Sequence, residues 1–240
     1  MQLIICEDSQ EASLKASEIV IQQLQNNPKT VLGLATGSTP IGLYKNLIDA
    51  FKKGKISFKD VVSYNLDEYL GIDRNHKESY YQFMHTHLFN HIDIKEENAH
   101  LPSNNLATIE QDIKAYNDAL SKTKIDIQIL GIGGNGHIGF NEPGTLFENE
   151  TFAVDLTEQT RLDNLRFFNH IDEVPKRAVT MGVKTILRSK KIILIATGKN
   201  KADAIQKMIK GPVTTALPAS ALQKHPDVVV ILDKAAASLL

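Results

Sequence analysis

The stretch GIGGNGHIGFNEPG, residues 131–144, carries side chains suited to proton transfer. His137 can accept or release a proton near neutral pH. Glu142, on the same loop, could accept one ring N–H and fix the tautomer of the imidazole. A lone loop histidine is more often structural, but the glycine-rich turns and nearby carboxylate favour a catalytic function, with Asn135 as the third polar member of the loop.

The same stretch contains Gly131-x-Gly133-x-x-Gly136, the glycine spacing of a dinucleotide-binding site. Such a site requires a helix that begins at these glycines, because its N-terminus holds the pyrophosphate. Pro143-Gly144 interrupts the chain too early for a helix of ordinary length, although Asp155 stands where a ribose-binding acid could lie. We therefore expect the glycines to shape the loop rather than to bind a nucleotide.

A second candidate group is NLDEY, residues 65–69, directly after the apolar run VVSY. Side chains alternate along a strand, so one of Asp67 and Glu68 is expected to face a ligand and the other to point away. A carboxylate placed there can act as a base toward a carbon next to a carbonyl, and Asp67 is the candidate. The structural alternative is that Asp67 caps the following turn.

The cluster ATGSTP, residues 35–40, predicts a site for an anion. Ser38 or Thr39 is a suitable helix N-cap. Pro40 suits the first helical position, and Gly37 permits close approach of the backbone. Free N–H groups at the start of a helix attract anions. A capped helix without a ligand is the alternative.

A similar cluster, ATGKNK (196–201), adds ammonium groups. Lys201 is expected at the start of a helix, where the helix dipole disfavours a cation and a bound anion would compensate. If the two strands are neighbours, the two clusters face one phosphate from two sides. Arg166, in NLRFF, is a further candidate for the phosphate, although the sequence alone favours a surface position.

These clusters follow short apolar strands that alternate with helix-like stretches. The expected strands are 3–6, 30–36, 61–66, 125–130, 177–183, 191–197 and 227–232, and the expected helices are 11–25, 40–53, 79–91, 109–122 and 201–210. This alternation predicts an α/β fold with a doubly wound, mostly parallel, Rossmann-like sheet. No linker or repeat divides the chain, so we expect a single domain over residues 1–240, with ligands at the carboxyl ends of the strands.

Charge and composition exclude several classes of protein. Lys plus Arg (27) nearly balance Asp plus Glu (28) and form no basic patch, so no nucleic-acid partner is expected. No run approaches the roughly 18 apolar residues of a membrane span, and no signal segment is evident. We expect a soluble, cytoplasmic protein without a membrane partner, and a buried Cys6.

The histidines do not predict a metal site. His85, His87 and His91 share one helical stretch, but only His87 and His91 have the spacing that puts them on one face. No paired-cysteine or HExxH pattern occurs, so no metal is expected.

Spacing and polarity thus predict a phosphate ester as ligand, with a carboxylate and a histidine for proton transfer. The series ATGSTP, NLDEYLG, GIGGNGHIGFNEPG and NLRFF, in this order, resembles the glucosamine-6-phosphate deaminase family. The similarity runs through essentially the whole chain. It implies an isomerising hydrolase of amino-sugar catabolism that converts glucosamine 6-phosphate to fructose 6-phosphate and ammonia, with no metal or organic cofactor.

The resemblance also implies a function for each candidate residue. Asp67 would take the C2 proton and return it at C1, and His137 would pass a proton from the C1 hydroxyl to the ring oxygen. Glu142 would orient His137. The family's phosphate contacts match Gly37, Ser38, Thr39, Arg166 and Lys201.

Two departures from the family pattern matter. Many members have aspartate where this chain has Asn135, whose amide can position His137 but adds no charge. Longer members bind N-acetylglucosamine 6-phosphate at a subunit interface, through basic residues after the NEP turn and a C-terminal extension. Residues 145–156 here hold no basic residue and the chain ends at Leu240, so we expect no activation by that effector, and a monomer or small homo-oligomer.

The polar segment 145–174 carries Arg166 and is expected to form a mobile lid over the sugar. Two other functions stay open. A 6-phosphogluconolactonase-like hydrolase shares the fold, the phosphate and a GHxxxF-type loop, but typically has SLFP-like residues where this chain has NEP. A non-catalytic sugar-phosphate sensor would need a DNA-binding appendage or the loss of Asp67, His137 or Glu142.

Overall fold

A parallel sheet of seven strands forms the centre of the molecule in the computed structural model, which describes residues 1–165 and 168–240. Its order is β1-β10-β9-β6-β2-β3-β5. The strands are β1 (Gln2–Cys6), β2 (Val31–Leu34), β3 (Val62–Asn65), β5 (Ala99–His100), β6 (Ile127–Leu130), β9 (Lys191–Ala196) and β10 (Val228–Asp233). The expected α/β class with a mostly parallel sheet is confirmed.

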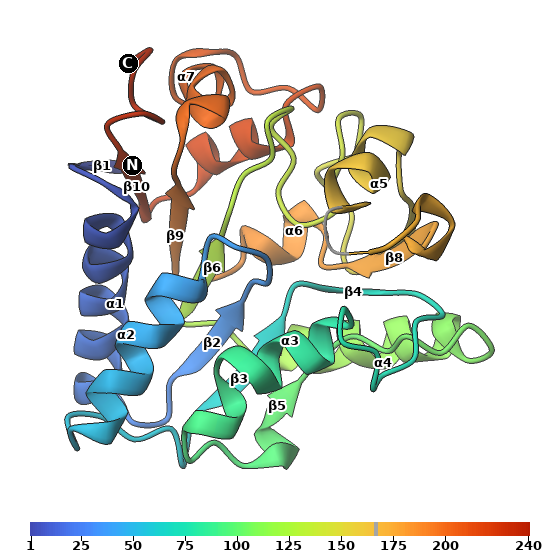
Figure 1. Cartoon of the computed structure of the whole chain (residues 1–240), viewed down its shortest axis with the longest axis horizontal. Helices are drawn as coiled ribbons and strands as arrows, with labels where there is room; N and C mark the ends of the chain where they lie inside the picture. The colour runs from blue at the N-terminus through green and yellow to red at the C-terminus, as the bar shows by residue number, and fades with distance from the viewer. Residues whose placement is uncertain (166–167) are drawn as a thin grey trace.

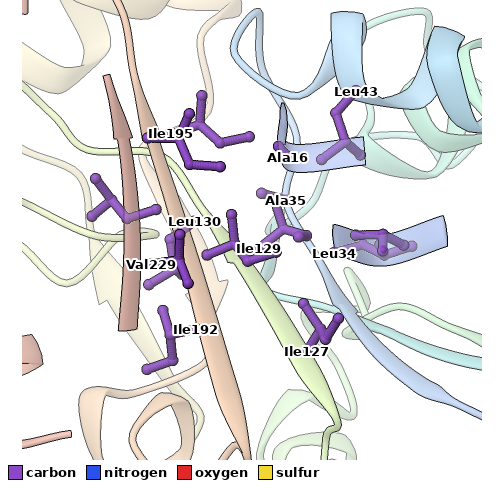
Figure 2. Close-up of a cluster of buried hydrophobic side chains, with 14 of the residues drawn as sticks. Ala16, Leu34, Ala35, Leu43, Ile127, Ile129, Leu130, Ile192, Ile195 and Val229 are labelled. Atoms are coloured by element: carbon purple, nitrogen blue, oxygen red, sulfur yellow. The ribbon is translucent and has the colours of Figure 1, made fainter. Parts of the chain in front are cut away.

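The central strands form because their sequences are apolar without interruption. In β9 the residues from Ile192 to Ala196 are buried, and β10 is buried along its whole length. Figure 2 shows Ile129, Ile195 and Val229 of neighbouring strands packed together in the interior. Burial on both faces removes the polar alternation of a half-exposed strand, so these segments are recognisable from composition alone.

Helices connect successive strands and pack on the sheet (Figure 1). They are α1 (Ser9–Asn26), α2 (Ile41–Lys52), α3 (Tyr80–His87), α4 (Ile109–Lys122), α6 (Val183–Ile186) and α7 (Ala202–Lys210), with short 3-10 turns η1 (Phe89–His91), η2 (Glu96–Asn98), η5 (Lys199–Lys201) and η6 (Pro218–Lys224). Helix α1 lies beside α2 and against β9 and β10. Helix α3 ends before the predicted His91, because Leu88 has a non-helical backbone and a 3-10 turn follows.

A small antiparallel sheet, β4-β8-β7, stands beside the central one and was not predicted. It consists of β4 (Asp67–Tyr69), β7 (Phe152–Asp155) and β8 (Arg177–Thr180), and Asp67 pairs with Thr180. The sequence placed 177–183 as a strand of the parallel sheet, which is wrong. The strand stops at Thr180, and α6 begins directly after Gly182.

The segment 145–174 contains β7, helix α5 (Glu158–Asn164) and the 3-10 turn η4 (Ile171–Glu173). It lies on the side of the molecule away from α1 (Figure 1). None of the helices in the described parts of the chain is long and apolar enough to cross a membrane.

Candidate active site

A cavity of about 1170 Å³ opens where the parallel strands end. The residues that follow β2, β3, β6 and β9 all contribute to its wall. Most of the predicted site residues line it: Gly37, Ser38, Thr39, Asp67, His137 and Lys201. Asn135 and Glu142 contact His137 from behind, and Arg166 lies outside the described residues.

The end of β2 turns into α2 through the predicted phosphate loop. Gly37 has a φ of 87°, which side-chain-bearing residues rarely adopt, so glycine is required by the backbone here. The prediction that Ser38 or Thr39 caps α2 is wrong. Pro40 occupies the cap position in a helical conformation, and no side chain caps the helix. The Ser38 and Thr39 residues instead line the cavity next to the helix N-terminus, a favourable place for an anion.

Strand β6 lies between β2 and β9. The strands that carry the two polar clusters are therefore not neighbours, so the arrangement considered from the sequence is wrong. The glycine loop after β6 fills the space between them. A Cβ at Gly131 would lie 3.7 Å from Thr39 Oγ1, and one at Gly134 would lie 3.6 Å from the Asn200 carbonyl oxygen. The loop thus packs closely against both ends.

Gly133 makes room for the catalytic candidate of this loop. A Cβ at this position would lie 2.2 to 2.5 Å from imidazole atoms of His137, closer than two atoms can approach. Backbone hydrogen bonds from Gly133 N to His137 O (2.9 Å) and from Gly136 N to Gly133 O (3.0 Å) close the turn. No helix occurs in 131–151, all of which the structure describes, so the helix required by a dinucleotide fingerprint is absent there.

Glu142 lies behind His137 in a buried polar network. Its Oε2 is 3.7 Å from His137 Nδ1 and accepts a hydrogen bond from Asn135 Nδ2 at 2.9 Å. Asn135 Oδ1 in turn accepts the His137 backbone N–H at 3.1 Å. The second carboxylate oxygen, Oε1, accepts a hydrogen bond from the hydroxyl of Thr160 on α5. The sequence did not point to Thr160, because nothing local distinguishes one helical threonine from another.

Asp67 faces the cavity and Glu68 points away, in agreement with strand alternation. Glu68 accepts hydrogen bonds from the backbone N–H groups of Tyr80 and Tyr81 and so holds the start of α3. The Asp67 carboxylate caps no turn, since none of the described residues donates a hydrogen bond to its oxygens. A Cβ at Gly139, on the His137 loop, would lie 3.3 Å from Asp67 Oδ2.

Burial dominates the electrostatics of Asp67. The side chain is only 6% exposed, and this desolvation, reinforced by the charge of Glu68, raises the pKa of Asp67 to about 8. A carboxyl group with such a pKa gives up its proton near neutral pH and is a much stronger base than an exposed aspartate.

Lys201 stands at the N-cap of α7, as expected, and lines the cavity beside Asn200. Lys45 and Lys77 also line it and were missed, because lysines on helices and loops are common solvent-facing residues. These lysines and the α2 N-terminus line one cavity, which is therefore suited to an anion, and Asp67 and His137 supply proton-transfer groups there. In the described residues, no group of three histidine, cysteine or acidic side chains is placed to hold a metal ion.

Comparison with known proteins identifies the family of this chain. The model of the family described as glucosamine-6-phosphate isomerases/6-phosphogluconolactonase matches residues 7–231. The chain belongs to this family. It is 52% identical over its full length, and over 95% of the relative, to a protein named glucosamine-6-phosphate deaminase from Thermoanaerobacter pseudethanolicus. It is 51% identical to one of the same name from Mycoplasma mycoides, again over its full length and over 98% of the relative.

Solved structures of the isomerase/lactonase family share the whole architecture. One described as a monomeric glucosamine-6-phosphate deaminase superposes over 100% of both chains with a TM-score of 0.97 and 44% identity. A 6-phosphogluconolactonase from Trypanosoma brucei superposes with a TM-score of 0.81 over 100% of this chain and 98% of its own, at 19% identity. The second similarity concerns the fold alone.

Proposed function

We propose that this chain is a glucosamine-6-phosphate deaminase that converts its substrate and water to fructose 6-phosphate and ammonia. The observation that carries the proposal is the placement of Asp67 and His137 on one cavity, with a helix N-terminus and lysines along the same wall. The choice of reaction is supported by proteins of that name that are 52% and 51% identical to this chain over its full length.

The phosphate of the substrate binds at the start of α2. Gly37, Ser38 and Thr39 offer backbone N–H groups and hydroxyls there, and Lys201 supplies a positive charge. Arg166 is proposed as a further phosphate ligand on the basis of the family resemblance alone. Binding energy at the phosphate holds the sugar carbons between Asp67 and His137.

Proton transfer then proceeds in two stages. His137 moves a proton from the C1 hydroxyl to the ring oxygen and opens the ring, and Glu142 and Asn135 hold its imidazole in place. Asp67 removes the C2 proton and returns it at C1. This isomerisation moves the carbonyl oxidation level from C1 to C2. Water then replaces the amino group at C2, and ammonia leaves. The substrate's own ammonium acidifies the C2 proton.

A coupled assay for fructose 6-phosphate and ammonia tests the function. We expect turnover of glucosamine 6-phosphate by the wild type and a loss of at least about 100-fold in kcat for Asp67→Asn, which keeps the shape but cannot accept the proton. Asp60→Asn is the matched control, because Asp60 is exposed and remote from the cavity. Wild-type activity in Asp67→Asn would show that Asp67 is not the catalytic base.

The same preparation should be assayed with 6-phosphogluconolactone. Hydrolysis of the lactone without ammonia release from the amino sugar would replace the proposal by the lactonase function that other family members carry in their names.

We also propose that the chain is a monomer. We further propose that it lies in the cytoplasm and forms one domain, and that residues 145–174 close over the sugar as a lid. The solved relative at 44% identity is described as monomeric, which supports the first point. Helix α5 and the residues after it contribute Thr160, Asn164 and Phe168 to the cavity wall, which supports the last.

A further inference from the structure

Thr160 is a buried residue at the cavity to which the proposed reaction assigns no step. It is the third residue of α5, is 5% exposed, and belongs to the cavity wall. Its hydroxyl donates a hydrogen bond to Oε1 of Glu142, a carboxylate that is itself 6% exposed. A hydrogen bond between two buried groups is shielded from water, so its geometry is enforced by the fold.

The direction of this hydrogen bond is fixed by a second hydroxyl. Thr157 Oγ1 donates to Thr160 Oγ1 at 3.0 Å, which leaves the Thr160 proton for Glu142. The other Glu142 oxygen accepts from Asn135 at 2.9 Å and lies 3.7 Å from His137 Nδ1. The carboxylate is therefore held from two sides, by its own loop and by α5.

Helix α5, which carries Thr160, is held in place by its N-cap and by contacts with the residues that follow it. Thr157 caps it by accepting the backbone N–H of Thr160 at 3.1 Å, and Arg161 donates to the Ile171 carbonyl at 2.7 Å. Phe168, beyond the helix, packs its ring 6.0 Å from that of Tyr69. The position of α5 thus decides whether the Thr160 hydroxyl reaches Glu142.

We propose that Thr160 is a positioning residue that fixes the Glu142 carboxylate and thereby couples the placement of α5 to the His137–Glu142 pair. The proposal rests on the proposed function, since it concerns the pair assigned to ring opening. Thr160 acts through Glu142 and touches no reacting atom.

Thr160→Val removes the hydroxyl at nearly constant volume. We expect kcat to fall about tenfold, the usual effect of losing a hydrogen bond to a charged group, with KM changed less than about twofold. Thr160→Ser keeps the donor and should restore kcat to within about twofold of the wild type. Thr108→Val is the matched control, because Thr108 also donates to a carboxylate, Asp112 (2.7 Å), but at the start of α4. It should leave both constants unchanged.

A nuclear magnetic resonance experiment separates positioning from a purely structural effect. The ring signals of His137, identified by their loss in His137→Gln, should shift in Thr160→Val and stay in place in Thr160→Ser and Thr108→Val. Thr160→Ala serves as a second hydroxyl deletion if the valine variant does not fold. Lower thermal stability without a shift of the His137 signals would overturn the proposal.

Other outcomes are equally decisive. The positioning role would be contradicted by a wild-type kcat in Thr160→Val, or by an equal loss of kcat in Thr160→Ser. A change of KM without a change of kcat would also contradict it. A wild type that forms no fructose 6-phosphate would instead refute the proposed function, while the His137 signals would still report whether the hydroxyl of Thr160 controls the pair.

Discussion

Asp67 shows how burial, reinforced by a neighbouring charge, can prepare a side chain for chemistry. The carboxyl group is deeply buried, receives no hydrogen bond from the described residues, and stands next in the chain to a second carboxylate, Glu68. Burial and the charge of Glu68 disfavour the ionised form of Asp67 and raise its pKa to about 8. An exposed aspartate would be fully ionised at pH 7 and would be a weak base toward carbon.

The raised pKa predicts the pH dependence of deamination. Asp67 must be ionised to accept the C2 proton, so kcat/KM should rise with pH up to a limb near 8 and fall about tenfold per unit below it. Initial rates from about pH 6 to 9, in buffers of constant ionic strength, measure this limb. A flat profile below the limb would contradict the assignment of Asp67 as the base.

Asn135 gives a second prediction for a single residue. Its Nδ2 donates to Glu142 at 2.9 Å, so Asn135→Asp would replace this donor by an oxygen and set two carboxylates against each other. The acceptor for the His137 N–H would remain. Like charges favour protonation of one partner, so we expect activity to persist while the acid limb of the kcat profile moves to higher pH. An unchanged profile would mean that this contact is not coupled to His137.

At the scale of elements, the loop after β6 and helix α5 form the site together. The loop carries His137 and Glu142, Gly133 leaves space for the imidazole, and α5 supplies the hydroxyl of Thr160. The loop closes through short-range hydrogen bonds within its own turn. Helix α5, in contrast, meets the loop only through tertiary contacts, which fits the proposal that its segment moves as a lid.

The proposed lid predicts protection by ligand. Trypsin should cut within 145–174, where Arg161 offers a site, and fructose 6-phosphate should slow this cleavage several-fold because it holds the segment closed. Fructose without phosphate is the control and should give no protection. Mass spectrometry of the fragments follows the cleavage, and equal rates with and without the sugar phosphate would count against a lid.

At the scale of the whole molecule, the residues that follow β2, β3, β6 and β9 form the site at the carboxyl ends of the parallel strands. Residues of a single chain thus line this cavity, as the proposed monomer requires. The stretch 145–156, where the resemblance would place an effector's basic ligands in longer relatives, holds only acidic, polar and apolar residues.

This arrangement predicts simple kinetics. We expect a hyperbolic dependence of rate on glucosamine 6-phosphate, no change with N-acetylglucosamine 6-phosphate, and a mass of one chain (26.6 kDa) by light scattering. A sigmoidal curve that the acetylated sugar phosphate makes hyperbolic would show an allosteric oligomer instead.

The sequence by itself determined the fold class and the candidate residues, because both depend on local patterns. Uninterrupted apolar runs such as KIILIA are typical of strands buried on both faces, and polar clusters directly after them meet at one edge of a parallel sheet. The Pro143-Gly144 break after His137 likewise argues against a nucleotide-binding helix from the sequence alone, because a proline so close to the glycines leaves no room for one.

Only the tertiary structure decided how these parts meet. Strand order placed β6 between β2 and β9, and backbone pairing took Arg177–Thr180 out of the parallel sheet into a second, antiparallel one. The burial of Asp67 and the hydrogen bond from Thr160 to Glu142 depend on residues distant in the chain. Such contacts are set by packing between whole elements, and no local pattern in the sequence records which elements will be neighbours.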